Sequence, residues 1–157
     1  MSSGSKARFP AEVDDLLRAA GWFPGRAVDT TPCSAAWAEL GLTGGPTEFV
    51  REFDGLTVTH PPFVDVGEVR HFDHTGFGVV DAVAGLSPRM YREYSTLAGV
   101  DLYPVGEDRS HMTLMVGSGT LFAGVDNYLF AHPGGLDEAV ARICAGARPG
   151  LVGEWSP

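Results

Sequence analysis

The stretch "MTLMVGSGTLFAGV", residues 112–125, decides the class of fold that the sequence indicates. Two apolar runs, 112–116 and 120–125, stand on either side of Gly117, Ser118 and Gly119, and this is the pattern of a β-hairpin. Working outward, "LYPVG" at 102–106 predicts a strand before the hairpin, and "NYLFA" at 127–131 predicts an edge strand after it. The late part of the chain is therefore expected to form an antiparallel sheet.

Helical patterns precede and follow these strands. Apolar residues recur at helical spacing in Pro10–Ala20, where a proline fits the first turn and Gly21 ends the helix. Further helices are expected at 34–40, 47–53, 88–98 and 136–144, and strands at 56–60 and 68–74. Helices and strands do not alternate as they do in βαβ units. The sequence thus predicts a single α+β domain, an antiparallel β-sheet flanked by N- and C-terminal helices. The domain spans 9–147, with tails at 1–8 and 148–157.

The charge of the chain restricts its partners. Twenty acidic residues against 11 basic ones give a net charge of −9, and Lys6 is the only lysine. Nucleic-acid binders need a basic stripe to neutralise phosphates, and anionic membranes attract basic segments, so neither partner is expected. A basic protein partner fits an acidic surface. With no long apolar run and no secretory signal, a cytoplasmic protein is expected, in which Cys33 and Cys144 stay reduced.

One short motif could carry metal chemistry. "HFDH" at 71–74 offers His71, Asp73 and His74, which are all metal-ligand types, so a small metal-dependent hydrolase is an alternative function. The motif resembles the latter part of the metallo-β-lactamase metal motif, but Val69 occupies the position of its preceding histidine. No other motif has catalytic strength. We therefore expect no enzyme, no cofactor and no metal.

Four segments, in order, carry a family resemblance. They are "GWFPGR" at 21–26, "EFVREFDGLTV" at 48–58, "LYPVGE" at 102–107 and "GLDEAVARICAG" at 135–146. This series resembles the third subgroup of the SUKH superfamily of bacterial immunity proteins, over about residues 9–147. Asp54 departs from the pattern, because it replaces the first glycine of a Gly-Gly-Leu segment.

The resemblance implies a function of binding, not of catalysis. Such proteins occupy a secreted toxin, often a nuclease, and protect the producing cell. The net charge of −9 agrees independently, since it complements a basic nuclease. An intracellular regulatory scaffold is a further alternative, which differs only in its partner.

The bend of the first segment has two interpretations. Trp22 can fold back over the core while Pro24 and Gly25 fix the turn, and Arg26 can cap carbonyls or pair with a carboxylate. These four residues would then hold the fold together. Tryptophan and arginine are also favoured anchors at protein interfaces, so the bend is a second candidate for partner binding.

Carboxylates on turns and strand ends are the first candidates for partner binding, because ordered charges cost less to immobilise. The predicted partner-binding residues are Asp101, Tyr103, Glu107, Asp108, Asp126 and Tyr128. Asp65 and Glu68 are second choices.

Overall fold

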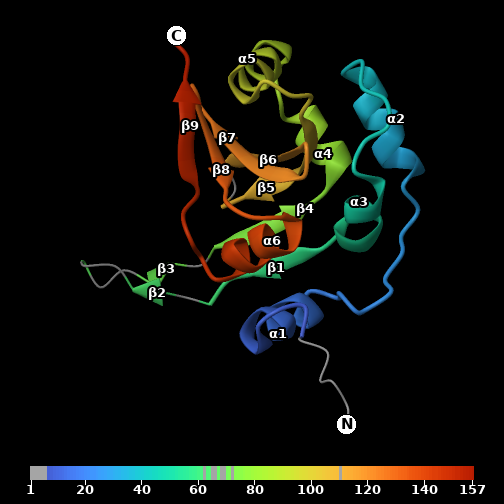
Figure 1. The fold of residues 1–157 in the computed structure, drawn as a ribbon. Helices are drawn as coiled ribbons and strands as arrows, with labels where there is room; N and C mark the ends of the chain where they lie inside the picture. Colours follow the sequence, from blue (N-terminus) through green and yellow to red (C-terminus); the bar gives the residue numbers. More distant parts are fainter. Residues whose placement is uncertain (1–6, 62, 65–66, 68–69, 72, 110) are drawn as a thin grey trace.

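The computed structural model describes residues 7–61, 63–64, 67, 70–71, 73–109 and 111–157 (Figure 1). The helices are α1 (Ala11–Ala19), α2 (Thr31–Glu39), α3 (Thr47–Phe53), α4 (Val79–Ala84), α5 (Pro88–Ala98) and α6 (Leu136–Cys144). The strands are β1 (Thr57–Thr59), β2 (Phe63–Val64), β3 (Arg70–His71), β4 (His74–Phe77), β5 (Tyr103–Asp108), β6 (Met112–Gly117), β7 (Thr120–Val125), β8 (Tyr128–His132) and β9 (Gly150–Glu154).

The main sheet has seven strands in the order β1-β4-β5-β6-β7-β8-β9, and all neighbours are antiparallel. The predicted hairpin is present as β6 and β7, with Gly117 opposite Thr120. Its two turn residues, Ser118 and Gly119, have φ of 50° and 77°, which is the twist that a two-residue hairpin turn requires. The predicted α+β fold with an antiparallel sheet is confirmed.

The end of the chain differs from the prediction. β8 was expected at the edge of the sheet, and 148–157 was expected to be a tail. Instead β9 pairs along β8 and becomes the edge strand, with Tyr128 opposite Glu154. The sequence 150–154 is short and mostly exposed, so it lacks the alternation of a half-buried strand and is held by pairing with β8.

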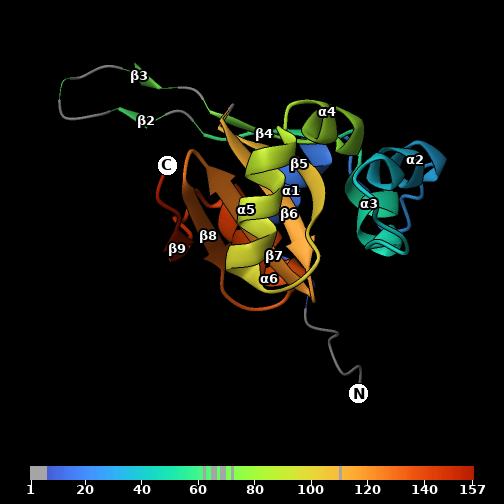
Figure 2. The same cartoon turned by 90° about the horizontal axis from the view of Figure 1, so that it is seen from above.

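Helices cover both faces of the sheet (Figures 1 and 2). α5 lies on one face, where Tyr94 packs with Met115, Phe122 and Leu129. α1, α3 and α6 contribute to a larger cluster on the opposite face, against residues such as Leu114, Leu121 and Ala123. Figure 2 shows α5 in front of the strands, with α1 and α6 behind them. We call these the α5 face and the α6 face of the sheet.

The predicted helices are present, and most have bounds close to the predicted ones. α3 and α6 have the predicted bounds, and α5 begins where Ser87 Oγ accepts the backbone N–H of Met90 at 3.1 Å. α2 begins at Thr31, three residues before the predicted start, because Pro32 occupies its first turn. Its Trp37 is buried, and the indole Nε1 donates to the carbonyl oxygen of Pro104 in β5 at 2.9 Å.

The first described residues belong to the fold. Arg8, which was predicted to lie in a tail, forms ion pairs with Glu52 of α3 and Asp137 of α6. Phe9 is buried and lies edge-on to Trp22, with 5.6 Å between the ring centroids. Residues 1–6 of the predicted tail lie outside the described residues. In the part of the chain that is described, no helix has the length and apolarity to cross a membrane.

Candidate functional site

The bend after α1 joins this helix to α3. Gly21 has φ of 106° and reverses the chain, so that Trp22 turns back over the core and is only 4% exposed. Its indole Nε1 donates to Glu52 Oε1 on α3 at 2.9 Å. Phe23, the next residue, points the other way and is 54% exposed. The bend therefore buries one aromatic ring and leaves the other on the surface.

Arg26 caps the end of α3. Its Nη1 donates to the carbonyl oxygen of Glu52 at 2.6 Å and its Nη2 to that of Asp54 at 2.9 Å. These carbonyls lie at the carboxyl end of the helix, where backbone acceptors lack partners within the helix and a cation is favoured. Gly25, at φ of 84°, gives the preceding turn its shape, and Pro24 is exposed. Of the two interpretations of the bend, the contacts of Trp22 and Arg26 are those of residues that hold the fold together.

Asp54, which replaces the first glycine of the family's Gly-Gly-Leu segment, makes a structural contact. Its backbone is at φ of −59°, so the position does not require a glycine. The side-chain Oδ1 accepts the backbone N–H of Val79, the first residue of α4, at 2.9 Å. Asp54 thus caps α4 from the end of α3.

The structure does not gather the predicted partner-binding residues on one surface. Asp101 and Tyr103 lie at the start of β5, where the Tyr103 hydroxyl donates to the carbonyl oxygen of Thr43 at 2.6 Å. Glu107 lies near the other end of that strand. It is opposite Thr113, which shares a face with Met115, so its side chain is exposed on the α5 face.

Asp126 and Tyr128 lie at the turn between β7 and β8. Asp126 is exposed in the turn with φ of 49°, and Tyr128 is 39% exposed. Tyr128 is opposite Val125, which shares a face with the buried Ala123, so Tyr128 lies on the α6 face. It is therefore on the other side of the sheet from Glu107. Asp65 and Glu68 lie outside the described residues.

Asp108 differs most from its prediction, because it is buried and only 6% exposed. Its Oδ1 accepts the Thr75 hydroxyl at 2.5 Å, and the same hydroxyl lies 2.7 Å from His60 Nε2. Burial by itself would raise the pKa of Asp108, but the contacts with His60 and Thr75 outweigh it and hold that pKa below its usual value of 3.8. Asp108 is thus part of an internal polar chain that runs from His60, just after β1, through Thr75 on β4 to β5. Its carboxylate is buried and is not exposed for contact with a partner.

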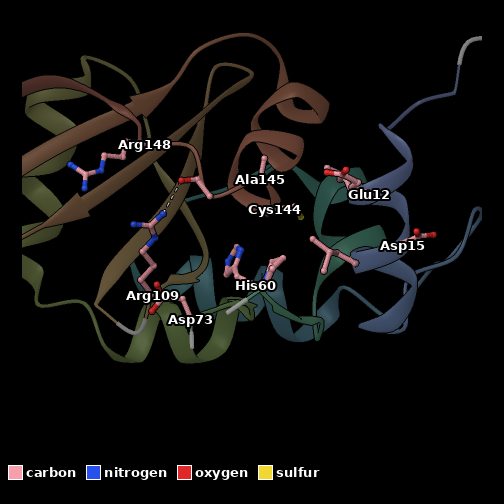
Figure 3. Close-up of a pocket in the computed structure, with 12 residues that line it drawn as sticks. Glu12, Asp15, His60, Asp73, Arg109, Cys144, Ala145 and Arg148 are labelled. Atoms are coloured by element: carbon pink, nitrogen blue, oxygen red, sulfur yellow. Dashed lines mark hydrogen bonds between the residues drawn. The ribbon is translucent and has the colours of Figure 1, made fainter. Parts of the chain in front are cut away.

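His60, at one end of this polar chain, lines a cavity of about 780 Å³ (Figure 3). Its walls come from α1, the segment after β1, the β5–β6 turn and the carboxyl end of α6. Figure 3 shows Glu12 and Asp15 on one side, Arg109 and Arg148 on the opposite side, and His60 between them. Acidic and basic residues thus line the same cavity, and the charged ends of Asp15 and Arg148 are turned away from it.

The thiol in this cavity is not an activated nucleophile. Cys144 lines the wall, but burial raises its pKa to about 12, so the reactive thiolate is scarce at neutral pH. Within the described ranges, no three His, Cys, Asp or Glu side chains are placed to hold a metal ion. Of the predicted metal motif, Asp73 borders the cavity, His74 begins β4, and the side chain of His71 lies outside the described residues.

A second buried histidine lies on β8. His132 is 1% exposed, and neither ring nitrogen has a hydrogen-bond partner among the described residues. Burial lowers the pKa of His132, and the positive charges of Arg142 and Arg109 lower it further against the opposing effect of Asp108. The ring is therefore kept neutral in the folded protein.

Sequence reasoning missed the residues that form the cavity. Glu12, His60, Arg109 and Arg148 are far apart in the chain, and no local pattern connects them. Thr75 carries a weak signal, because it is a polar residue on the inward side of a short strand.

The fold and site describe a small α+β domain whose first, third and last helices are tied by a Trp-x-Pro-Gly-Arg bend and by Arg8. The bend is one of the four segments that carry the family resemblance. The model of the SUKH-3 immunity protein family matches residues 9–146, and the chain belongs to this family. No curated protein and no solved structure gives a significant match.

Proposed function

We propose that this protein binds a cognate protein toxin, of a basic and nuclease-like kind, and neutralises it by stoichiometric association in the cytoplasm. Membership of an immunity protein family carries the proposal. The net charge of −9 supports a basic partner, because opposite charges speed the encounter of two proteins. The buried thiols of Cys33 and Cys144 are free, as is usual in a reducing compartment.

The proposed mode of action is binding without catalysis, cofactor or metal. The high pKa of the Cys144 thiol supports this, as does the position of Asp108, whose carboxylate is engaged inside the fold. Direct contact with nucleic acid or with a membrane is not part of the proposal, since an acidic surface repels phosphates.

The best-supported contact surface is the corner where β8 meets β9. We define this β8–β9 corner as Asp126, Tyr128, Leu151, Val152 and Glu154. Tyr128, Leu151 and Val152 are 39%, 60% and 44% exposed, and they are three of the five large apolar residues exposed in the described chain. Glu154 is paired across from Tyr128, and Asp126 is two residues before it. An exposed aromatic anchor with acidic neighbours suits a basic protein surface.

The test begins with capture of the cognate toxin from the cell that makes it, followed by binding kinetics at several salt concentrations. Asp126→Lys with Glu154→Lys should slow association and flatten its salt dependence, and Tyr128→Ala should speed dissociation. Asp101→Lys with Glu107→Lys is the matched control, since it makes the same charge change away from the corner. A larger effect from the control pair would move the contact surface to β5, and failure to protect cells from any captured toxin would refute the function.

A further inference from the structure

An apolar strip lies on the outer strands of the sheet, on its α6 face. Tyr128 and Phe130 share this face of β8, with 6.3 Å between their ring centroids, and Leu151 on β9 lies opposite Phe130. Leu151 is 60% exposed, the highest value for a large apolar residue in the described chain. Figure 1 shows β9 as the outermost strand on this side of the sheet. The strip is therefore open to a partner along the edge of the sheet.

One end of this strip is basic. Arg142 on α6 and Arg148 line a hollow of about 490 Å³, together with Leu151 at the start of β9. Arg142 Nη2 donates to the carbonyl oxygen of Arg148 at 2.9 Å, which keeps Arg142 beside the segment that leads into β9. Among the described residues, neither guanidinium group forms an ion pair. A carboxylate from another molecule can therefore bind here, because guanidinium groups pair well with carboxylates.

The other end of the strip is acidic. Glu154 lies across from Tyr128, and Asp126 is in the turn two residues before Tyr128. Both carboxylates are exposed, and in the part of the chain that the structure describes neither forms an ion pair. Glu154 and Gly150 are the two ends of β9, which are about 13 Å apart at the usual rise of a strand. Opposite charges are thus held at a fixed separation along one strand.

A surface with opposite charges at its two ends and apolar side chains between them is complementary to itself. A two-fold rotation about an axis at the centre of the strip reverses the direction of β9, so the Glu154 end of one copy meets the Arg148 end of the other. Each such contact is made twice, because a two-fold interface uses the same residues on both sides. Leu151 is three residues from Arg148 and three from Glu154, so it lies nearest the axis.

The charges favour a second copy of this chain as the occupant of the whole strip. A basic partner suits Asp126 and Glu154, but it would place like charges against Arg142 and Arg148. A second copy satisfies both ends, since two acids of each copy meet two arginines of the other. The net charge of −9 on each chain still opposes association, so the contact is expected to be weak and transient.

We propose that two copies of this chain form a homodimer through this strip, with their β9 strands antiparallel. Glu154 of each copy enters the hollow between Arg142 and Arg148 of the other, and the two Leu151 side chains meet at the two-fold axis. The dimer covers the β8–β9 corner, so a toxin that binds the corner displaces the second copy. The dimer itself forms without a toxin and does not depend on the proposed function.

The first experiment measures association by sedimentation velocity from about 1 μM to about 1 mM, which brackets weak protein–protein affinities. The parent should form a dimer in the upper part of this range. Arg148→Glu and Glu154→Arg, each alone, should weaken the dimer about fivefold or more, because each places like charges at both symmetric contacts. A mixture of the two single variants should form a heterodimer tighter than either homodimer, since every contact then joins opposite charges.

Two further variants are the matched controls. Arg89→Glu and Glu107→Arg make the same changes of charge at exposed positions outside the strip, and they should associate as the parent does, alone or mixed. Circular dichroism shows that each variant is folded. A parent that stays monomeric throughout, or single variants that show no preference for the heterodimer, would overturn the proposal.

The second experiment tests the position of the axis. Leu151→Cys should form a disulfide between two chains under a mild oxidant, because residues beside a two-fold axis come within bonding distance of each other. Cys33 and Cys144 are buried and do not compete. Val80→Cys on α4 is the control, since Val80 is 52% exposed and lies outside the strip. Cross-linking of Val80→Cys as fast as that of Leu151→Cys would count against the proposed axis. Neither experiment uses a toxin, so failure of the dimer leaves the immunity function standing.

Discussion

Trp37 on α2 and Pro104 on β5 are joined by a hydrogen bond of 2.9 Å from the indole Nε1 to the backbone carbonyl oxygen. Both residues are buried, and the Trp37 ring is edge-on to Tyr103 with 5.2 Å between the centroids. The bond lies beside the bulge at Pro104–Gly106, where the pairing of β5 with β6 shifts. It gives a partner to a carbonyl and fixes α2 against the sheet.

Trp37→Phe should therefore destabilise the protein. Phenylalanine fills most of the space but leaves the buried carbonyl of Pro104 without its donor, which costs about 1–3 kcal/mol of unfolding free energy. Urea denaturation followed by circular dichroism measures the change. Trp155→Phe is the control, because Trp155 is only half-buried, and an equal loss in both variants would contradict the role of the hydrogen bond.

Arg26→Lys should destabilise the protein although it keeps the charge. Lysine lacks the planar fork that reaches the two carbonyl oxygens of Glu52 and Asp54, so at least one charge-assisted hydrogen bond is lost. The expected loss is about 1.5–3 kcal/mol. Arg51→Lys, on the exposed side of the same helix, should change stability by less than about 0.5 kcal/mol. A stable Arg26→Lys protein would show that the capping bonds contribute little.

Asp54→Ala should weaken the start of α4. The backbone N–H of Val79 loses its acceptor, and loss of such a cap costs about 0.5–2 kcal/mol. Asp54→Gly, which restores the family pattern, should cost at least as much because glycine also gains freedom in the unfolded chain. Hydrogen exchange at Val79 provides the local readout. Asp81→Ala serves for comparison, and unchanged protection at Val79 in the Asp54 variants would refute the cap.

His132 should make the protein sensitive to mild acid. Its pKa is lowered by burial in the folded state, so the unfolded chain takes up a proton first as the pH falls below about 6.5. Stability from this group is complete above that pH and decreases as the pH falls toward the folded pKa. Between pH 7.5 and 5.5 the parent should lose more stability than His132→Leu. His111→Gln, at an exposed position, should follow the parent, and parallel curves for parent and His132→Leu would exclude His132 as the cause.

Local sequence signals predicted the elements whose ends depend on local chemistry. Gly21 and Gly41 have the positive φ expected of residues that end helices, and Ser87 caps α5. The turn at Ser118 and Gly119 fixes the register of β6 and β7. For Arg26 the sequence allowed either capped carbonyls or a paired carboxylate, and its hydrogen bonds go to the carbonyl oxygens of residues 52 and 54.

What could not be predicted depends on packing between distant segments. β9 is a strand because β8 offers an edge, and Gly150–Glu154 has no inward-facing apolar pattern of its own. From its sequence neighbours, Asp108 is expected in an exposed turn. The register of β5 after its bulge places Asp108 inside the fold instead, where Thr75 on β4 donates a hydrogen bond to its carboxylate. A carboxylate on a predicted strand end can therefore face either way until the neighbouring strand is known.

Among the described residues, the hydrogen bonds that Arg26 donates go to main-chain oxygens, and this affects which sequence changes the fold can accept. A contact with a carbonyl oxygen constrains the path of the chain and places no demand on the side chain at that position. Asp54 illustrates this freedom, since its carbonyl oxygen binds Arg26 while its side chain accepts the backbone N–H of Val79. Side chains at such positions can therefore change while the capping bonds, and with them the path of the chain, stay the same.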